Sequence, residues 1–152
     1  MEGNTRPTPS GYMVWRLSMK WRAEVDRRLA PLDLTHAQYS LLASLYGLTW
    51  AGARPSQREL ADFAGLEPIY VSKLVKALER DGLIRRTASR ADSRAVELEL
   101  TEGGQARILE AMVVIRSFLD DALAPIGGPD GEQNQVFMRL LEALLTGPMK
   151  GD

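Results

Sequence analysis

Four arginines crowd into ten residues near the middle of the chain, with one aspartate among them. They are Arg85, Arg86, Arg90 and Arg94, and Asp92 precedes the last by two positions. A guanidinium at a flexible hairpin tip can enter the narrow minor groove of DNA, where the negative potential is enhanced. The Asp92 carboxylate could hold the Arg94 guanidinium in a charge-assisted pair. Alone, the pattern is also typical of a polar turn with a surface ion pair of little energetic value.

A second group of side chains suited to DNA lies on a helix predicted over residues 68–81. One face carries Val71, Leu74, Val75 and Leu78 at helical spacing and is predicted to face the core. The opposite face carries Ile69, Ser72, Lys73 and Lys76, with Tyr70 at its edge. Lysine can donate to guanine or phosphate, the hydroxyls can bond to either, and isoleucine can pack on a thymine methyl. The alternative interpretation is a solvated face with two ordinary lysines.

The residues before this helix predict a helix-turn-helix. Ser56 and Glu59 match a capping box that opens a short helix over residues 57–64. Gly65 is placed to end that helix, and Pro68 fits the first turn of the next one. Two helices joined so closely form a helix-turn-helix.

After Gly82 the hydrophobic period changes from that of a helix to that of a strand. Residues 83–86 and 95–100 are predicted strands, and the small polar residues 88–93 suit a hairpin tip. A hairpin after a helix-turn-helix is the winged form of the motif. The predicted fold is mainly α with a small β-hairpin wing, and this context favours the DNA interpretation of both groups of side chains.

Longer helices are predicted on both sides of this lobe. The first, from Gly11, has an apolar stripe of Val14, Leu17, Trp21, Val25 and Leu29. Thr35 and Gln38 match another capping box, and the helix that they open is expected to loosen between Gly47 and Gly52. Thr101 can cap the next helix, whose stripe is Ile108, Ala111, Met112, Ile115, Leu119, Ala122 and Ile126.

A last helix is predicted over about residues 131–145. It presents Phe137, Leu140, Leu141 and Leu144. Together with the stripe before it, this is more apolar surface than a small winged lobe could cover. We interpret it as a dimer interface, because a two-fold dimer also places two recognition helices one DNA turn apart. The alternative is a helical core within one chain.

The composition limits the other kinds of protein that the chain could be. Its 152 residues include no cysteine and one histidine, His36. The missing cysteines exclude disulfides, thiolate metal sites and a thiol-based redox sensor, and a single histidine argues against a histidine metal cluster or a Ser-His-Asp triad. The glycine pairs at 103–104 and 127–128 match no phosphate-binding loop. We therefore predict no enzyme, no metal and no cofactor.

The charge is unevenly distributed along the chain. The net charge is −1, whereas residues 54–94 contain nine Lys or Arg and six Asp or Glu, a net of +3. A basic middle between acidic ends fits a DNA-binding lobe on an acidic scaffold. Charges interrupt the first twenty residues, and no apolar run is long enough to cross a bilayer. These features favour a cytoplasmic protein without membrane association.

Three segments resemble the MarR family of regulators. Residues 92–101, DSRAVELELT, resemble the family's wing, in which D-x-R precedes a strand that ends in Leu-Thr and a helix start with a glycine, here Gly103. Residues 34–39, LTHAQY, resemble the opening of its second helix, and residues 77–86, ALERDGLIRR, resemble its run from recognition helix into wing. The resemblance covers roughly residues 11–145.

The resemblance implies a homodimer that binds a pseudo-palindromic DNA operator, most simply as a repressor. It implies that Arg94 is the minor-groove arginine, that Asp92 positions it, and that Ser72 and Lys73 touch DNA. The expected domains are a flexible tail over residues 1–10, a dimerisation helix over 11–34, the winged helix-turn-helix lobe over 35–100, C-terminal dimerisation helices over 101–146 and a tail over 147–152.

Two questions stay open at the level of sequence. Many family members respond to small aromatic or anionic effectors, for which Trp15 and His36 are the candidate contacts; alternatively His36 only starts a helix and Trp15 only covers an interface.

The winged lobe could also be a protein-interaction module that does not bind DNA, or belong to another family of winged-helix repressors. The basic outer face argues against the first of these, and the wing triplet argues against the second.

Overall fold

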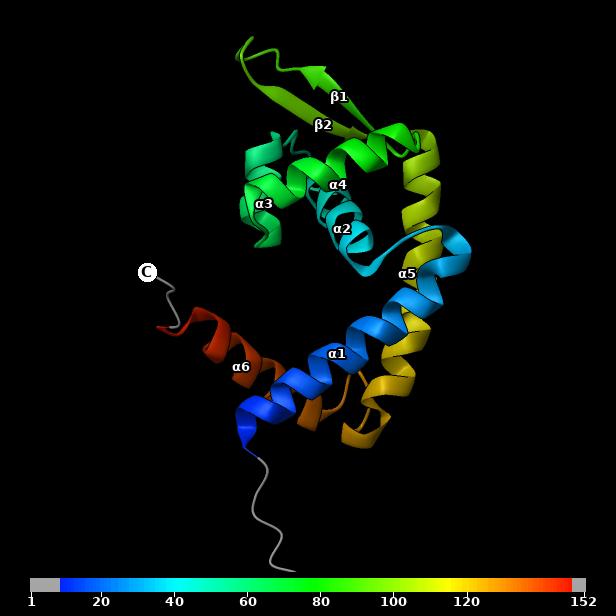
Figure 1. Cartoon of the computed structure of the whole chain (residues 1–152), viewed down its shortest axis with the longest axis vertical. Coiled ribbons are helices and arrows are strands. Elements are labelled where there is room, and N and C mark those ends of the chain that lie inside the picture. The colour runs from blue at the N-terminus through cyan, green and yellow to red at the C-terminus, as the bar shows by residue number, and fades with distance from the viewer. Residues whose placement is uncertain (1–8, 149–152) are drawn as a thin grey trace, which may run out of the picture. The chain divides into compact units, whose positions relative to one another are not determined.

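The computed structural model describes residues 9–148. The predicted tails over residues 1–10 and 147–152 lie mostly outside this range. The fold is mainly helical with one two-stranded antiparallel hairpin, which confirms the predicted fold class (Figure 1). The chain divides into two compact units, residues 1–112 and 113–152. Among the described residues, no helix combines the length and apolarity needed to span a membrane.

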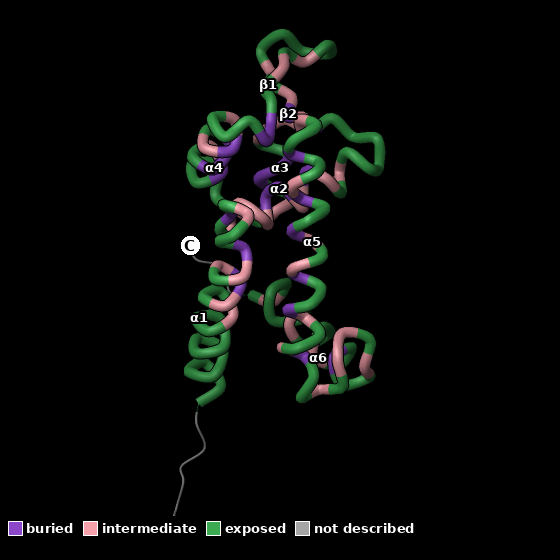
Figure 2. Tube along the Cα trace, turned by 90° about the vertical axis from the view of Figure 1, so that its right-hand side faces the viewer, coloured by how far each residue is buried: buried purple, intermediate pink, exposed green. Residues whose placement is uncertain are grey.

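The core of the first unit is built from three helices, α2 (His36–Trp50), α3 (Gln57–Ala64) and α4 (Pro68–Arg80). Each contributes apolar side chains that are almost completely buried, namely Leu41, Leu42 and Leu45 from α2, Leu60 and Ala61 from α3, and Val71, Leu74, Val75 and Leu78 from α4. Figure 2 shows the buried positions gathered in this part of the unit. The helical spacing predicted the buried face of α4 in full.

Local hydrogen bonds at the helix ends explain why these helices begin and end where they do. Both predicted capping boxes form: the Thr35 and Ser56 hydroxyls accept from the backbone N–H three residues on, and the side chains of Gln38 and Glu59 accept in return. Gly65 closes α3 in the left-handed conformation, with φ of 66°. These local signals needed no tertiary information, so the sequence was sufficient to predict them.

The predicted break between Gly47 and Gly52 is wrong, because α2 continues to Trp50. Gly47 is accommodated inside the helix, and the Thr49 hydroxyl donates to the Leu45 carbonyl at 2.7 Å. The chain turns at Gly52 instead, where φ is 83°.

The hairpin consists of β1 (Ile84–Ala88) and β2 (Val96–Leu100), and its tip lies away from the helices (Figure 1). Both strands begin one residue later than predicted. The second strand is also held on its outer edge, where the Leu98 N–H donates to the Pro55 carbonyl at 2.9 Å. The hairpin therefore has one edge attached to the segment before α3 and one edge formed by β1.

A close backbone contact anchors the base of the hairpin to α5 (Glu102–Leu123). A Cβ on Gly104 would lie 1.8 Å from the Leu83 carbonyl oxygen, so only glycine fits there. The sequence pattern had singled out Gly103, where a Cβ would meet nothing nearer than 3.8 Å. As predicted, Thr101 caps α5, and its hydroxyl accepts from the Gly104 N–H at 2.9 Å.

The first helix, α1 (Ser10–Leu29), is only partly buried. Of its predicted stripe, Val25 and Leu29 are buried, whereas Val14 and Leu17 are 55% and 45% exposed. Figure 2 shows the N-terminal half of α1 as exposed throughout. The second half of the stripe is buried as predicted, whereas no described residue of the same unit covers its first half.

A short 3-10 helix, η1 (Ala30–Leu32), forms the corner between α1 and α2. Asp33 takes the left-handed conformation there, with φ of 53°. The Arg107 guanidinium of α5 donates to the Leu32 carbonyl at 2.6 Å, which ties the corner to the start of that helix.

The second unit contains the end of α5, the 3-10 helix η2 (Ala124–Ile126) and α6 (Glu132–Thr146). The Asn134 side-chain amide donates to the Pro129 carbonyl at 2.7 Å and closes the turn before α6. Three residues of the stripe predicted for α5 are buried, namely Ile108, Ala111 and Ile115, and the other four, Met112, Leu119, Ala122 and Ile126, are half-buried. Phe118 and Leu123 are buried as well and were not predicted. On α6, Val136, Met138, Leu140, Leu144 and Leu145 are exposed.

Candidate nucleic-acid interface

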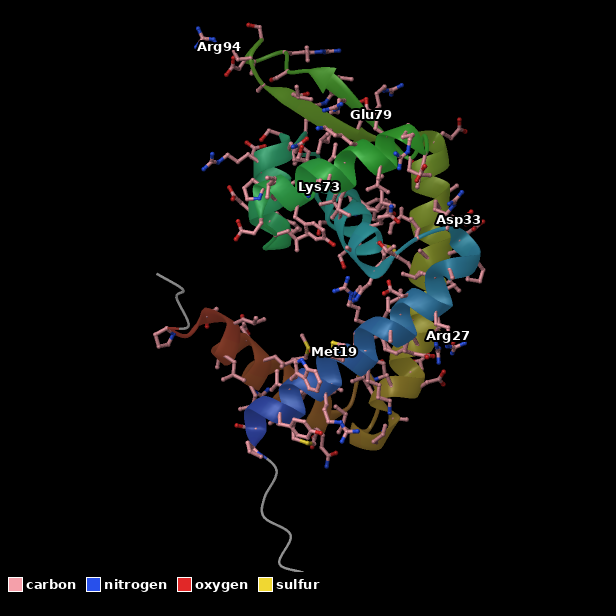
Figure 3. All side chains as sticks on the ribbon, in the orientation of Figure 1. Met19, Arg27, Asp33, Lys73, Glu79 and Arg94 are labelled. Atoms are coloured by element: carbon pink, nitrogen blue, oxygen red, sulfur yellow. The ribbon has the colours of Figure 1, made fainter. Side chains whose placement is uncertain are left out.

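The outer face of α4 presents the side chains that the sequence predicted for it. Ile69 is 74% exposed, Tyr70 is 39% exposed, Lys73 and Lys76 are exposed, and Ser72 is half-buried. Within the described residues, neither lysine has an ion-pair partner. Figure 3 labels Lys73 on α4. This face can therefore offer two free ammonium groups, two hydroxyls and one apolar side chain to a ligand.

The tip of the hairpin carries the second predicted group. Arg90, Asp92 and Arg94 are all exposed, and Figure 3 shows Arg94 at the end of the hairpin. The Asp92 carboxylate accepts from the backbone N–H of Arg94 at 2.9 Å, whereas the predicted pair with the Arg94 guanidinium does not form. Asp92 thus shapes the backbone of the turn. The two guanidinium groups have no acidic partner among the residues that the structure describes.

The turn itself is held by a compact set of hydrogen bonds. The Ser89 hydroxyl accepts from the N–H groups of Ala91 and Asp92 at 3.2 and 3.3 Å. The backbone bonds Ser89 N–H to Ala95 carbonyl and Ala95 N–H to Asp92 carbonyl are both 3.0 Å long. Because the backbone is held while the arginine side chains are free, the turn presents their charges without neutralising them.

At the base of the hairpin, by contrast, the two arginines of β1 are paired. Arg85 lies 3.2 Å from Glu99 on the neighbouring strand, and Arg54 also approaches Glu99, at 3.7 Å. Arg86 donates to Glu79 of α4 at 2.7 Å. The four arginines of the wing therefore fall into two classes, which their spacing in sequence did not separate.

Arg58, in the first turn of α3, is a basic residue that the sequence analysis did not select. It is exposed and lines a hollow of about 360 Å³ with Ser56, Gln57, Arg86, Ala95 and Val96. No ion pair involves Arg58 within residues 9–148. The capping box of Ser56 and Glu59 predicted where α3 begins, and Arg58 lies in that first turn. The first turn of α3 lies close to the wing in the structure, so the capping box was the signal in the sequence that could have pointed to Arg58.

The two candidate effector residues are not brought together. The backbone N–H of His36 donates to the Asp26 carboxylate of α1 at 2.6 Å. Trp15 lies eleven residues before Asp26 on the same helix, about 16 Å along its axis. Burial lowers the pKa of His36, an effect that Asp26 opposes and Arg22 adds to. Trp15 stacks with Tyr12 and, with Met13, Arg16, Leu17, Met19 and Lys20, lines a hollow of about 660 Å³.

The order of α2, α3, α4 and the hairpin defines a winged helix-turn-helix protein. The model of the MarR family matches residues 34–96. The uncharacterized HTH-type transcriptional regulator YdcH of Bacillus subtilis (strain 168) is 35% identical over 112 residues, which are 74% of this chain and 74% of YdcH. The chain belongs to the MarR family of transcriptional regulators.

Solved structures of similar proteins include DNA complexes. The transcriptional repressor CouR, bound to a 23-mer DNA duplex, is 28% identical, with a TM-score of 0.78 over 90% of this chain and 92% of CouR. The Mycobacterium tuberculosis transcriptional regulator MosR, in complex with DNA, is 27% identical, with a TM-score of 0.72 over 91% of this chain and 97% of MosR. The similarity thus extends over nearly the whole chain and beyond the winged lobe.

Proposed function

We propose that the chain is a homodimeric repressor that binds a pseudo-palindromic DNA operator. The observation that carries this proposal is the coincidence of free cations on two parts of one lobe, Lys73 and Lys76 on α4 and Arg94 at the hairpin tip. A helix fits the major groove and an arginine fits the narrow minor groove beside it. The DNA complexes of CouR and MosR support the same use of this fold.

In this proposal α4 is the recognition helix and the hairpin is the wing. Ser72, Lys73 and Lys76 contact bases and phosphates in the major groove, and Ile69 and Tyr70 add apolar and hydroxyl contacts at the helix start. Arg94 enters the minor groove of the DNA, and Arg90 contacts the DNA backbone beside that groove. Asp92 shapes the turn, and the newly found Arg58 contacts a phosphate at the edge of the lobe.

The dimer is supported by apolar surface that each unit leaves open to solvent. In the first unit this surface is the N-terminal half of α1, with Tyr12, Met13, Val14, Trp15, Leu17 and Met19 exposed. In the second unit it is the outer side of α6, with Val136, Met138, Leu140, Leu144 and Leu145 exposed. Contiguous apolar surface of this kind marks an interface. We propose that a second copy covers both surfaces, with residues 11–34 and 101–146 as the dimerisation helices.

The proposal that a small aromatic or anionic effector releases the DNA now has one candidate contact from the sequence, Trp15. The hollow beside Trp15 combines apolar side chains with Arg16 and Lys20, which suits an aromatic anion. His36 does not line that hollow, and the hydrogen bond that it makes to Asp26 comes from its backbone N–H at the first position of α2. We therefore propose a local structural role for His36 at the start of α2.

Selection from a random duplex library at moderate salt tests the DNA-binding function directly. We expect the retained DNA to contain an inverted repeat whose half-sites are about one helical turn apart. We also expect the logarithm of the binding constant to fall linearly with the logarithm of the salt concentration. Absence of both enrichment and salt-sensitive binding would contradict the proposal and leave the protein-interaction module as the better account.

A further inference from the structure

Arg85 and Arg86 are neighbours on β1, but they lie on opposite faces of the hairpin. In the strand register, Arg85 is opposite Glu99, and Arg86 is opposite Leu98. Side chains alternate between the two faces of a strand, so Arg86 shares its face with Ile84 and Leu98, which are 2% and 1% exposed. Arg86 is thus a charged residue in the row that faces the helices.

From that position the Arg86 guanidinium reaches α4. Its Nε donates to Glu79 Oε2 at 2.7 Å, and the two side chains are 38% and 37% exposed. Glu79 lies in the last turn of α4, on the helix that carries Lys73 and Lys76. Figure 3 shows Glu79 where α4 passes the hairpin. The contact therefore joins the two elements on which the candidate DNA contacts lie.

The other attachments of the hairpin act elsewhere. The Leu98 N–H and a bridge between Ser56 and Glu97 hold the outer edge of β2. At the base, the Thr101 hydroxyl donates to the Gly82 carbonyl at 2.6 Å. Beyond the base, the bond from Arg86 to Glu79 is the hydrogen bond that joins β1 to a helix among the described residues. A two-stranded hairpin has little stability of its own, so its direction depends on such ties.

We propose that the Glu79–Arg86 ion pair positions the wing relative to the recognition helix. The pair sets the direction of the hairpin so that Arg94 reaches the minor groove while Lys73 and Lys76 occupy the major groove. Arg86 is a positioning residue in this account and does not touch DNA. Because exposed ion pairs contribute little to the free energy of unfolding, its effect is on geometry. The inference rests on the proposed DNA-binding function.

A distance measurement without DNA tests the positioning directly. The chain has no cysteine, so spin labels can be placed at Asp62→Cys on α3 and Ala91→Cys at the hairpin tip without removing native thiols. Labelled chains are mixed with excess unlabelled chains, so that only distances within one subunit contribute to electron double resonance. We expect Arg86→Met to broaden or shift the distance distribution, because methionine keeps much of the aliphatic stem and loses the charge.

Arg85→Met is the matched control, since it removes the neighbouring pair on the opposite face. We expect it to leave the distance distribution unchanged. The charge exchange Glu79→Arg with Arg86→Glu should restore the wild-type distribution. An unchanged distribution in Arg86→Met would overturn the proposal, and so would equal broadening in both methionine variants.

Binding to the selected operator provides a second test, which separates positioning from direct contact. If Arg86 acts by directing Arg94, the losses are not additive, and Arg86→Met combined with Arg94→Ala binds about as weakly as Arg94→Ala alone. If Arg86 touches phosphate, the losses multiply, the salt dependence becomes shallower and the charge exchange does not restore affinity. Those results would contradict the inference while leaving DNA binding intact.

Failure of the proposed DNA-binding function would look different. In that case the selection would enrich no duplex and binding would not depend on salt. The spin-label distances would still decide whether Glu79 and Arg86 hold the hairpin in place.

Discussion

The winged lobe and the N-terminal half of α1 are both rich in apolar residues, but only the lobe buries them. Leu42 and Leu45 of α2 are 0% and 1% exposed, whereas Trp15 and Leu17 of α1 are 58% and 45% exposed. The lobe therefore has a closed core within one chain. The first half of α1 has an apolar surface that is exposed in the single chain, and the proposed dimer would bury it.

Charges on the first half of α1 would break this comparison most strongly. We expect Met13→Glu with Leu17→Glu to prevent dimerisation, because both side chains are exposed in the single chain and would face an apolar interface in the dimer. Losing the second lobe should reduce operator affinity by about 100- to 10,000-fold. Sedimentation and operator titration measure the two effects. A dimeric double variant would show that this face is not the interface.

Alanine substitutions sharpen the same comparison in terms of stability. We expect Leu42→Ala to lower the free energy of unfolding by about 2–5 kcal/mol, because it leaves a cavity in the core of the lobe. Leu17→Ala should change the stability of the isolated chain by less than about 0.5 kcal/mol. Denaturant unfolding at a protein concentration that favours monomers measures the free energy of unfolding of both variants. Similar losses at both positions would contradict the distinction between the two regions.

Removing the free guanidinium at the hairpin tip should have a smaller effect, confined to DNA. We expect Arg94→Ala to weaken operator binding by about 1–3 kcal/mol and to leave the dimer intact. Arg85→Met is the control in the same hairpin, because that guanidinium is already paired with Glu99. Equal affinity of wild type and Arg94→Ala would remove the hairpin tip from the binding mechanism.

The smallest expected effect is on the pH dependence of stability. Burial lowers the pKa of His36 below its usual 6.5, so the unfolded chain binds that proton more readily than the folded chain. Stability should therefore fall as the pH drops through 6.5, and His36→Gln should make that fall shallower. Unfolding titrations at about pH 7.5 and pH 5.5 measure the difference. A fall of the same size in His36→Gln would show that another group causes it.

Local patterns predicted the parts of the fold that depend on neighbouring residues. The capping boxes at Thr35 and Ser56, the end of α3 at Gly65 and the buried face of α4 all depend on neighbours within one or two helical turns. The same periodicity predicted the buried Val25 and Leu29 of α1, whereas Val14 and Leu17 of the same stripe are exposed. Periodicity does not say what covers a stripe, so it could not tell that the stripe's first half is exposed in the single chain.

The candidate site was predicted by residue type, but the roles of its charges were not. Arg85 and Arg86 are equivalent in sequence, and only the strand register and the proximity of α4 show that they pair with Glu99 and Glu79. The position of Asp92 was informative, but its carboxylate binds the Arg94 backbone instead of the guanidinium. Such details depend on turn geometry and on contacts between elements far apart in sequence.

The central claim is that two winged lobes of one dimer bind a single DNA duplex. Native mass spectrometry of the wild-type chain with the duplex enriched by selection tests it most directly. We expect a complex of two chains with one duplex at a protein concentration where Met13→Glu with Leu17→Glu gives none. A wild-type complex of one chain with one duplex, or no complex at all, would contradict the account.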